Sequence, residues 1–169
     1  MNYRVVCVCA IVALAVAMAS AQTKASFSGH CGKPDVQRSI SVPDKPDHSF
    51  VLSQGKCTTT KGEIGGAMSK QGAFSEHGEM MGTRLKNSGV YVETYDSGDK
   101  VYYTYQTTAT MKDGALQAGT NKYQIVGGTG KMQGIKGSGG CKLTGTADGG
   151  LDYACSGDYT LAAAAAAKQ

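Results

Sequence analysis

Short turns separate strand-like segments throughout the C-terminal half of the chain. Lys100–Thr110 is dense in β-branched and aromatic residues, which is typical of a strand. The Asp-Gly pair within Lys112–Gly114 is typical of a hairpin turn and leads into a second strand over Leu116–Val126. Gly140–Ala147 and Leu151–Leu161 form a last hairpin. Turns this short join antiparallel neighbours, because a parallel pair needs a crossover of about a dozen residues.

The N-terminal half has a weaker pattern of strands. The sequence predicts a strand over Lys24–His30, an irregular connection over Gly32–Pro46 and a strand over His48–Thr60. It then predicts two or three short strands within Lys61–Gly89, with turns near Gly65–Gly66 and Gly78. A strand over Val90–Tyr95 follows. Seven to nine strands are therefore expected. An antiparallel meander of this size commonly closes into a barrel, which removes its unpaired edges, and eight strands is the usual number. We predict an all-β, roughly eight-stranded barrel, with a β-sandwich as the alternative.

The N-terminus has the pattern of a secretory signal peptide over residues 1–21. An apolar run, Val5–Met18, follows a cationic start and precedes the small residues Ala19-Ser20-Ala21. This run of about 14 residues is too short to cross a bilayer comfortably, so cleavage after Ala21 is favoured over an uncleaved anchor. Cys7 and Cys9 would leave with the signal peptide. We expect a secreted or periplasmic protein with no membrane span after cleavage.

The remaining chain fits one domain, residues 22–161, followed by an alanine-rich tail, 162–169. Loss of Arg4 with the signal peptide lowers the formal charge from +4 to +3. The lysines are scattered along the chain and form no cluster of the kind that nucleic acids need, so we expect no nucleic-acid partner.

Four cysteines remain after cleavage, and they permit three pairings. A hairpin folded at Ala147–Gly150 places Cys141 and Cys155 opposite each other or one position apart, close enough for a disulfide. Cys31 then pairs with Cys57. Two disulfides are expected in an oxidising compartment.

A metal site formed by His30, Cys31 and His48 is the competing interpretation of these residues. The spacings of common zinc sites are missing, so we expect no metal and no cofactor. The remaining acidic and histidine cluster, Glu76, His77 and Glu79, fits a turn better than a metal site or a proton shuttle.

Four tyrosines on two neighbouring strands are the candidate ligand-binding residues. Tyr103 and Tyr105 share one face of their strand, and Tyr91 and Tyr95 share a face of the preceding strand with Glu93. Such a face could hold an apolar body and fix it through hydroxyl groups, although tyrosine is also an ordinary strand residue. Glu93 is the candidate general base if it points inward, but the rarity of buried glutamate favours an outward, solvated position.

The segment Val126–Gly139 contains Gly-Gly-Thr-Gly followed by Lys131-Met132-Gln-Gly-Ile-Lys-Gly. It lacks the Lys-Ser/Thr pair of a phosphate-binding loop. It resembles a glycine-rich stretch of the allene oxide cyclase and dirigent barrels, where an aromatic residue is common at the position of Met132. The strand pattern agrees with that resemblance over Val90–Leu161. The N-terminal half, with Cys31 and Cys57, looks more like small exported bacterial proteins of this barrel type that have no assigned function.

The resemblance implies a barrel that binds an apolar or phenolic molecule in its mouth, and it implies homo-oligomers. Catalytic residues of the family cannot be matched to positions here. The leading hypothesis is therefore binding of a small apolar or aromatic ligand without turnover. The alternatives are a cyclase- or dirigent-like isomerising enzyme and an envelope or protein-interaction protein with a filled barrel. A buried carboxylate or tyrosine facing a pocket would support the enzyme, and bulky side chains filling the interior would support the third hypothesis.

Overall fold

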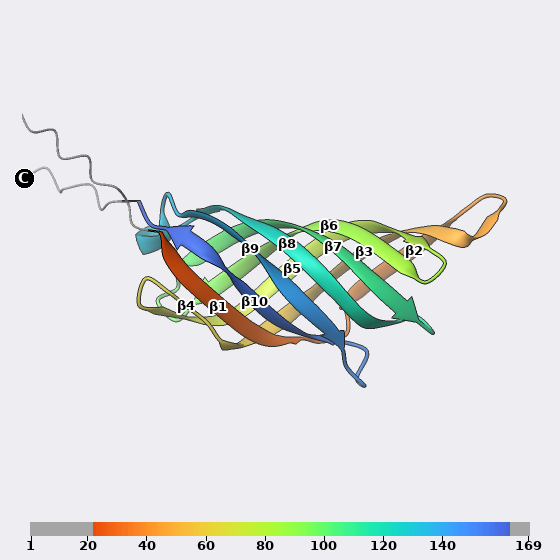
Figure 1. Cartoon of the computed structure of the whole chain (residues 1–169), viewed down its shortest axis with the longest axis horizontal. Coiled ribbons are helices and arrows are strands. Elements are labelled where there is room, and N and C mark those ends of the chain that lie inside the picture. Colours follow the sequence, from red (N-terminus) through yellow and green to blue (C-terminus); the bar gives the residue numbers. More distant parts are fainter. Residues whose placement is uncertain (1–21, 163–169) are drawn as a thin grey trace, which may run out of the picture.

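The computed structural model describes residues 22–162 and shows an almost entirely β-stranded chain (Figure 1). Its elements are β1 (Thr23–Cys31), β2 (Val36–Val42), β3 (Lys45–Lys61), β4 (Glu63–Ile64), β5 (Ala67–Met81), β6 (Arg84–Tyr95), β7 (Lys100–Lys112), β8 (Ala115–Gly128), the short 3₁₀ helix η1 (Gly130–Met132), β9 (Lys136–Gly145) and β10 (Leu151–Thr160). The predicted signal peptide, and all but the first residue of the predicted alanine-rich tail, lie outside the described residues.

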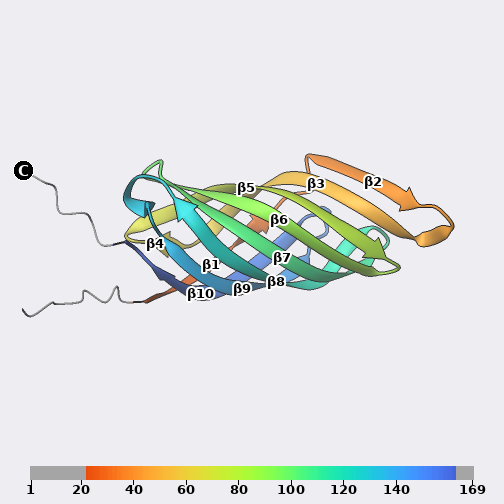
Figure 2. The same cartoon turned by 90° about the horizontal axis from the view of Figure 1, so that it is seen from above.

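The strands form one antiparallel sheet that closes on itself. The order of hydrogen-bonded neighbours is β3-β1-β10-β9-β8-β7-β6-β5, and β5 pairs with β3 to complete the ring. The predicted eight-stranded antiparallel barrel is therefore confirmed. Strand β2 pairs only with β3, and the two form a hairpin that extends past one end of the barrel (Figure 2).

The other end of the barrel is packed with apolar side chains. Ile64 at the end of β4, Met132 from η1 and Ile135 are each at most 1% exposed. They join Tyr95 and Val101 in the main hydrophobic cluster. The glycine-rich connection from β8 to β9 makes this possible, because Gly130 and Gly134 adopt the positive φ values (52° and 74°) that glycine tolerates. This connection contains a single 3₁₀ turn at the packed end of the barrel.

Two stretches of the N-terminal half differ from their prediction. The connection predicted over Gly32–Pro46 contains strand β2, whose pairing with β3 leaves almost all of its residues exposed and so without an apolar alternation to detect. The turn predicted at Gly78 is wrong, because Gly78 lies inside β5 and the chain reverses at Gly82. Gly78 is needed for close packing instead: a Cβ there would lie 2.6 Å from the carbonyl oxygen of Lys86.

Both predicted disulfides are present, and each joins directly paired residues on neighbouring strands. Cys31 and Cys57 connect β1 to β3, and Cys141 and Cys155 connect β9 to β10. The first bond ties the N-terminal strand to the strand that completes the ring. Within residues 22–162, no helix is long and apolar enough to cross a membrane.

We predict that the double variant Cys31→Ser/Cys57→Ser loses about 3 kcal/mol of unfolding free energy. The disulfide joins cysteines 26 residues apart, and without it the unfolded chain regains conformational entropy. Urea unfolding without reductant measures this loss. Ser39→Ala on the exposed strand β2 is the control and should leave the midpoint unchanged. Equal midpoints for the double variant and the wild-type protein would contradict the role assigned to this disulfide.

Candidate functional site

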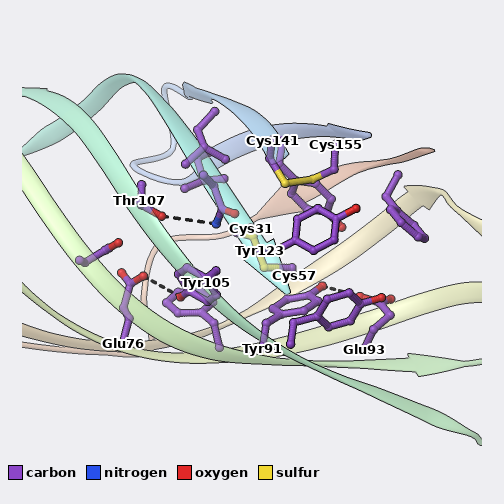
Figure 3. A pocket seen from close by; sticks show the side chains of 18 of the residues that line it. Cys31, Cys57, Glu76, Tyr91, Glu93, Tyr105, Thr107, Tyr123, Cys141 and Cys155 are labelled. Atoms are coloured by element: carbon purple, nitrogen blue, oxygen red, sulfur yellow. Dashed lines mark hydrogen bonds between the residues drawn. A yellow bond between two sulfur atoms is a disulfide. The ribbon is translucent and has the colours of Figure 1, made fainter. Parts of the chain in front are cut away.

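The barrel is hollow in the half that the apolar cluster leaves unfilled. It contains a cavity of about 170 Å³ (Figure 3). Leu85, Leu116 and Leu151 line the cavity near the starts of β6, β8 and β10, at the end opposite the packed cluster, and each is only half-buried. This end is therefore the entrance side of the cavity.

Tyrosine rings and both disulfides form most of the cavity wall. The aromatic lining residues are Phe27, Phe74, Tyr91, Tyr103, Tyr105, Tyr123 and Tyr153. All four disulfide cysteines also face the cavity. Tyr103 packs edge-on against Tyr91 and Tyr123, with ring centroids 5.9 and 5.7 Å apart, so three strands share one aromatic cluster.

Glycines on the neighbouring strands make room for these rings. A Cβ at Gly89 would lie 2.6 Å from Cζ of Tyr105, and a Cβ at Gly29 would lie 2.6 Å from Cζ of Tyr153. Each ring therefore lies against a stretch of wall that carries no side chain. This pairing of a large residue with the smallest one keeps the tyrosines beside the wall and leaves the centre open.

Glu93 points into the barrel, where its side chain is almost fully buried. Its residue is 4% exposed, and its carboxylate accepts hydrogen bonds from the hydroxyls of Thr59 (2.9 Å), Ser69 and Tyr91 (2.5 Å). Tyr153 lies 2.9 Å from Thr59 and donates to it when Thr59 donates to Glu93. The outward position favoured for Glu93 is thus wrong: three hydroxyl donors replace the water that burial removes.

A second carboxylate, Glu76, faces the cavity from β5. It accepts hydrogen bonds from the hydroxyls of Tyr105 (2.7 Å) and Ser53 (3.1 Å). Burial raises the pKa of Glu76, and these two hydrogen bonds oppose the rise. The turn predicted around Glu76 is also wrong, since the residue lies within a continuous strand and is paired with Gly89.

Burial raises the pKa of each cavity tyrosine, so their hydroxyls keep their protons at neutral pH. The second largest cause of the raised pKa is the negative charge of Glu93 for Tyr91 and the negative charge of Glu76 for Tyr105. Burial is also the main cause for Tyr103. These side chains act as hydrogen-bond donors and not as bases.

A row of polar side chains crosses three strands on the entrance side of the aromatic cluster. Asn87, Thr107 and Asn121 are paired in register on β6, β7 and β8. The amide nitrogen of Asn121 donates to Thr107 at 3.4 Å. The Oδ1 atoms of Asn87 and Asn121 are buried and have no hydrogen-bond partner among the described residues. A buried amide oxygen without a partner is energetically costly.

The structure brings most of the predicted tyrosines to the cavity. Tyr91, Tyr103 and Tyr105 line it. Tyr95 does not line the cavity. It is 1% exposed and belongs to the packed cluster, and its hydroxyl oxygen lies 3.4 Å from the hydroxyl oxygen of Tyr103. We therefore keep the first three as proposed ligand contacts and assign Tyr95 to the core.

Several cavity residues were missed by sequence reasoning. Tyr123 and Tyr153 alternate with polar residues on their strands, as the predicted tyrosines do, so the same two-residue periodicity could have found them. Asn87 had no such signal, and Glu76 was considered only as part of the cluster with His77 and Glu79, which was assigned to a turn. They lie in the stretch 61–89, where the strands had not been placed.

His30 and His48 lie outside the cavity and bind carboxylates. His30 bridges Asp152 (2.9 Å) and Asp148 (3.0 Å), and His48 pairs with Glu79. The hydrogen bond to Asp152 is the main cause of a raised pKa at His30. Within residues 22–162, no group of three or more His, Cys, Asp or Glu side chains is placed to hold a metal ion.

Comparison with known proteins finds solved structures that resemble the chain. No family model and no curated protein matches the chain. The structure of the pterocarpan synthase dirigent protein GePTS1 is similar over 96% of this chain and 100% of that chain, with 12% sequence identity and a TM-score of 0.49. A similarity of this size establishes neither a family nor an activity for the chain.

The raised pKa of Glu76 predicts a pH dependence of stability. Because the folded state holds this proton more tightly than the unfolded chain, stability falls as pH rises from the ordinary value of 4.5 through the raised pKa of Glu76. Glu76→Gln is neutral at every pH, so we expect it to lose less stability than the wild-type protein across that range. Thermal unfolding at a series of pH values measures the difference. Glu63→Gln, at an exposed position, is the control, and parallel profiles for Glu76→Gln and wild type would contradict this assignment.

Proposed function

We propose that this protein is an exported barrel that binds a small molecule with an apolar or aromatic body, without turnover. The observation that carries the proposal is the hollow half of the barrel, a cavity of about 170 Å³ with seven aromatic rings in its wall. A concave, largely apolar site with a few fixed polar groups is the usual form of a small-molecule site. The two disulfides support export, because such bonds persist in oxidising compartments.

The filled interior that the protein-interaction hypothesis required is not present in residues 22–162, where side chains leave the cavity open. An isomerising enzyme is the second candidate, and one observation favours it. Glu76 faces the cavity with a raised pKa, which is typical of a carboxyl group that exchanges protons with a substrate.

Native mass spectrometry of protein exported with its own signal peptide tests the binding proposal. We expect a native mass that exceeds an integer multiple of the denatured chain mass by the mass of a retained ligand. Thr107→Phe places a ring in the cavity and should abolish this excess, because Thr107 lines the cavity and is 6% exposed. Thr108→Phe, one residue along on the exposed face, is the matched control and should retain it.

Equal excess mass in the two phenylalanine variants would contradict the cavity as the binding site, and no excess in the wild-type protein would contradict retention of a ligand. The retained molecule also separates the two candidate functions. Incubation of the identified ligand with the protein should return it unchanged if the protein only binds, whereas an isomerase should convert it and Glu76→Gln should stop the conversion.

A further inference from the structure

The charged side chains that line the cavity are all negative. Glu76 and Glu93 face it, and among the described residues that line it none is Lys, Arg or His. Neither carboxylate has a cationic partner, since the ion pairs within residues 22–162 involve only His30 and His48. The whole chain carries a formal charge of +4, so the interior has the opposite sign to the protein that encloses it.

The hydroxyl groups around the two carboxylates are already used as donors. Tyr91, Thr59 and Ser69 donate to Glu93, and Tyr105 and Ser53 donate to Glu76. The buried side-chain atoms without a hydrogen-bond partner among the described residues are both acceptors. Asn87 is 9% exposed and its Oδ1 has no partner, and the Oδ1 of Asn121 has none either, because that side chain donates to Thr107 through its nitrogen. A ligand that brings donors would satisfy these two oxygens.

Glu76 is the less fully compensated of the two carboxylates. Three hydroxyls satisfy Glu93, whereas two satisfy Glu76, one of them at 3.1 Å. Glu76 is paired with Gly89, and Asn87 follows two residues along β6, about 7 Å away at the usual rise of a strand. Glu93 lies four residues in the other direction, about 13 Å away. Glu76, the less fully compensated carboxylate, and the unpaired amide oxygens thus share the entrance side of the cavity.

The same region offers aromatic faces to a positive charge. The hydroxyl of Tyr105 donates a hydrogen bond to Glu76, and Tyr105 is paired in register with Tyr123. Figure 3 shows the rings of Tyr105, Tyr91 and Tyr123 between the two carboxylates. A cation beside a tyrosine ring and a buried carboxylate gains from both the ring quadrupole and the charge.

We propose that the ligand of this cavity is an organic cation, a protonated amine on an aromatic or apolar body, whose ammonium group binds Glu76 and whose body lies among the tyrosine rings. This proposal rests on the binding function proposed above and names the ligand class of the same site. It follows from the negative lining, the unpaired amide oxygens and the rings, which a neutral or anionic ligand would not match.

The tyrosines that face Glu76 from the neighbouring strands do not change charge as Glu76 titrates. Tyr105, Tyr91 and Tyr123 all have raised pKa values and stay neutral, and β3 contributes Ser53 and the disulfide-bonded Cys57. Glu93 is the other carboxylate of the cavity. Arg38, His77 and Lys122 flank the same region of the wall but point outward. His77 and Lys122 are next in sequence to the inward-facing Glu76 and Tyr123, and Arg38 is paired with Leu52, the neighbour of the inward-facing Ser53. Binding of the cation should therefore release a proton from Glu76 and weaken as pH falls.

Three probes with one aromatic body and different charges test the proposal: phenethylammonium, phenethyl alcohol and phenylacetate. Chemical-shift titration of the full exported protein at up to about 10 mM probe detects even a Kd of about 1 mM. We expect phenethylammonium to bind about tenfold more tightly than the alcohol, and phenylacetate to bind least. Glu76→Gln should abolish the preference for the cation, and Glu63→Gln should leave it intact.

Each outcome of this titration decides between the two proposals. If the alcohol or phenylacetate binds as well as the cation and Thr107→Phe blocks it, the binding function stands and the cation proposal is overturned. If none of the probes binds, both proposals are overturned. The pH dependence of binding to the wild-type protein gives the same decision and does not require a variant to fold. As the pH is lowered, the affinity for phenethylammonium should decrease while the affinity for the alcohol stays constant. Parallel pH profiles for the two probes would overturn the cation proposal.

Discussion

Closure of the sheet by the pairing of β3 with β5 is the constraint on which the interior depends. Once the ring is closed, every second residue of eight strands must share one small volume, which side chains of average size fill completely. Here the inward residues differ sharply in size, with tyrosine rings opposite glycines such as Gly89 and Gly29. Large apolar side chains, among them Ile64 and Met132, fill one half of the barrel, and the other half stays hollow.

The hollow half contains polar groups that a filled barrel would not tolerate. A carboxylate removed from water is costly unless donors replace its hydration, and the hydroxyls around Glu93 do this within the wall. At Glu76 the replacement is incomplete, which is why burial dominates its pKa. The partnerless amide oxygen of Asn87 lies on the same side. The carboxylate at the entrance side is incompletely hydrogen-bonded and the deeper one is fully hydrogen-bonded. This difference fits the proposal that a positively charged ligand binds at the entrance side.

The sequence predicted the barrel, its strand alternation from β6 onwards and both disulfides, because these follow from short-range signals. The tyrosine face of β7 was visible in a two-residue period, and the Cys141–Cys155 pair was visible in the distance of each cysteine from one turn. The direction of Glu93 was not predictable from β6 alone, since its three hydroxyl partners come from three different strands. Glu76 and Asn87 were missed because Gly78 looked like a turn, although its role is close packing inside β5.

The most direct test of this account is the titration of the Glu76 carboxyl group, followed by NMR of protein labelled with ¹³C at the glutamate carboxyls. A buried, incompletely compensated carboxylate predicts a pKa above its ordinary value of 4.5, and a pKa that falls when phenethylammonium is added. A pKa at or below the ordinary value, unchanged by the amine, would contradict the hollow, acceptor-lined interior described here.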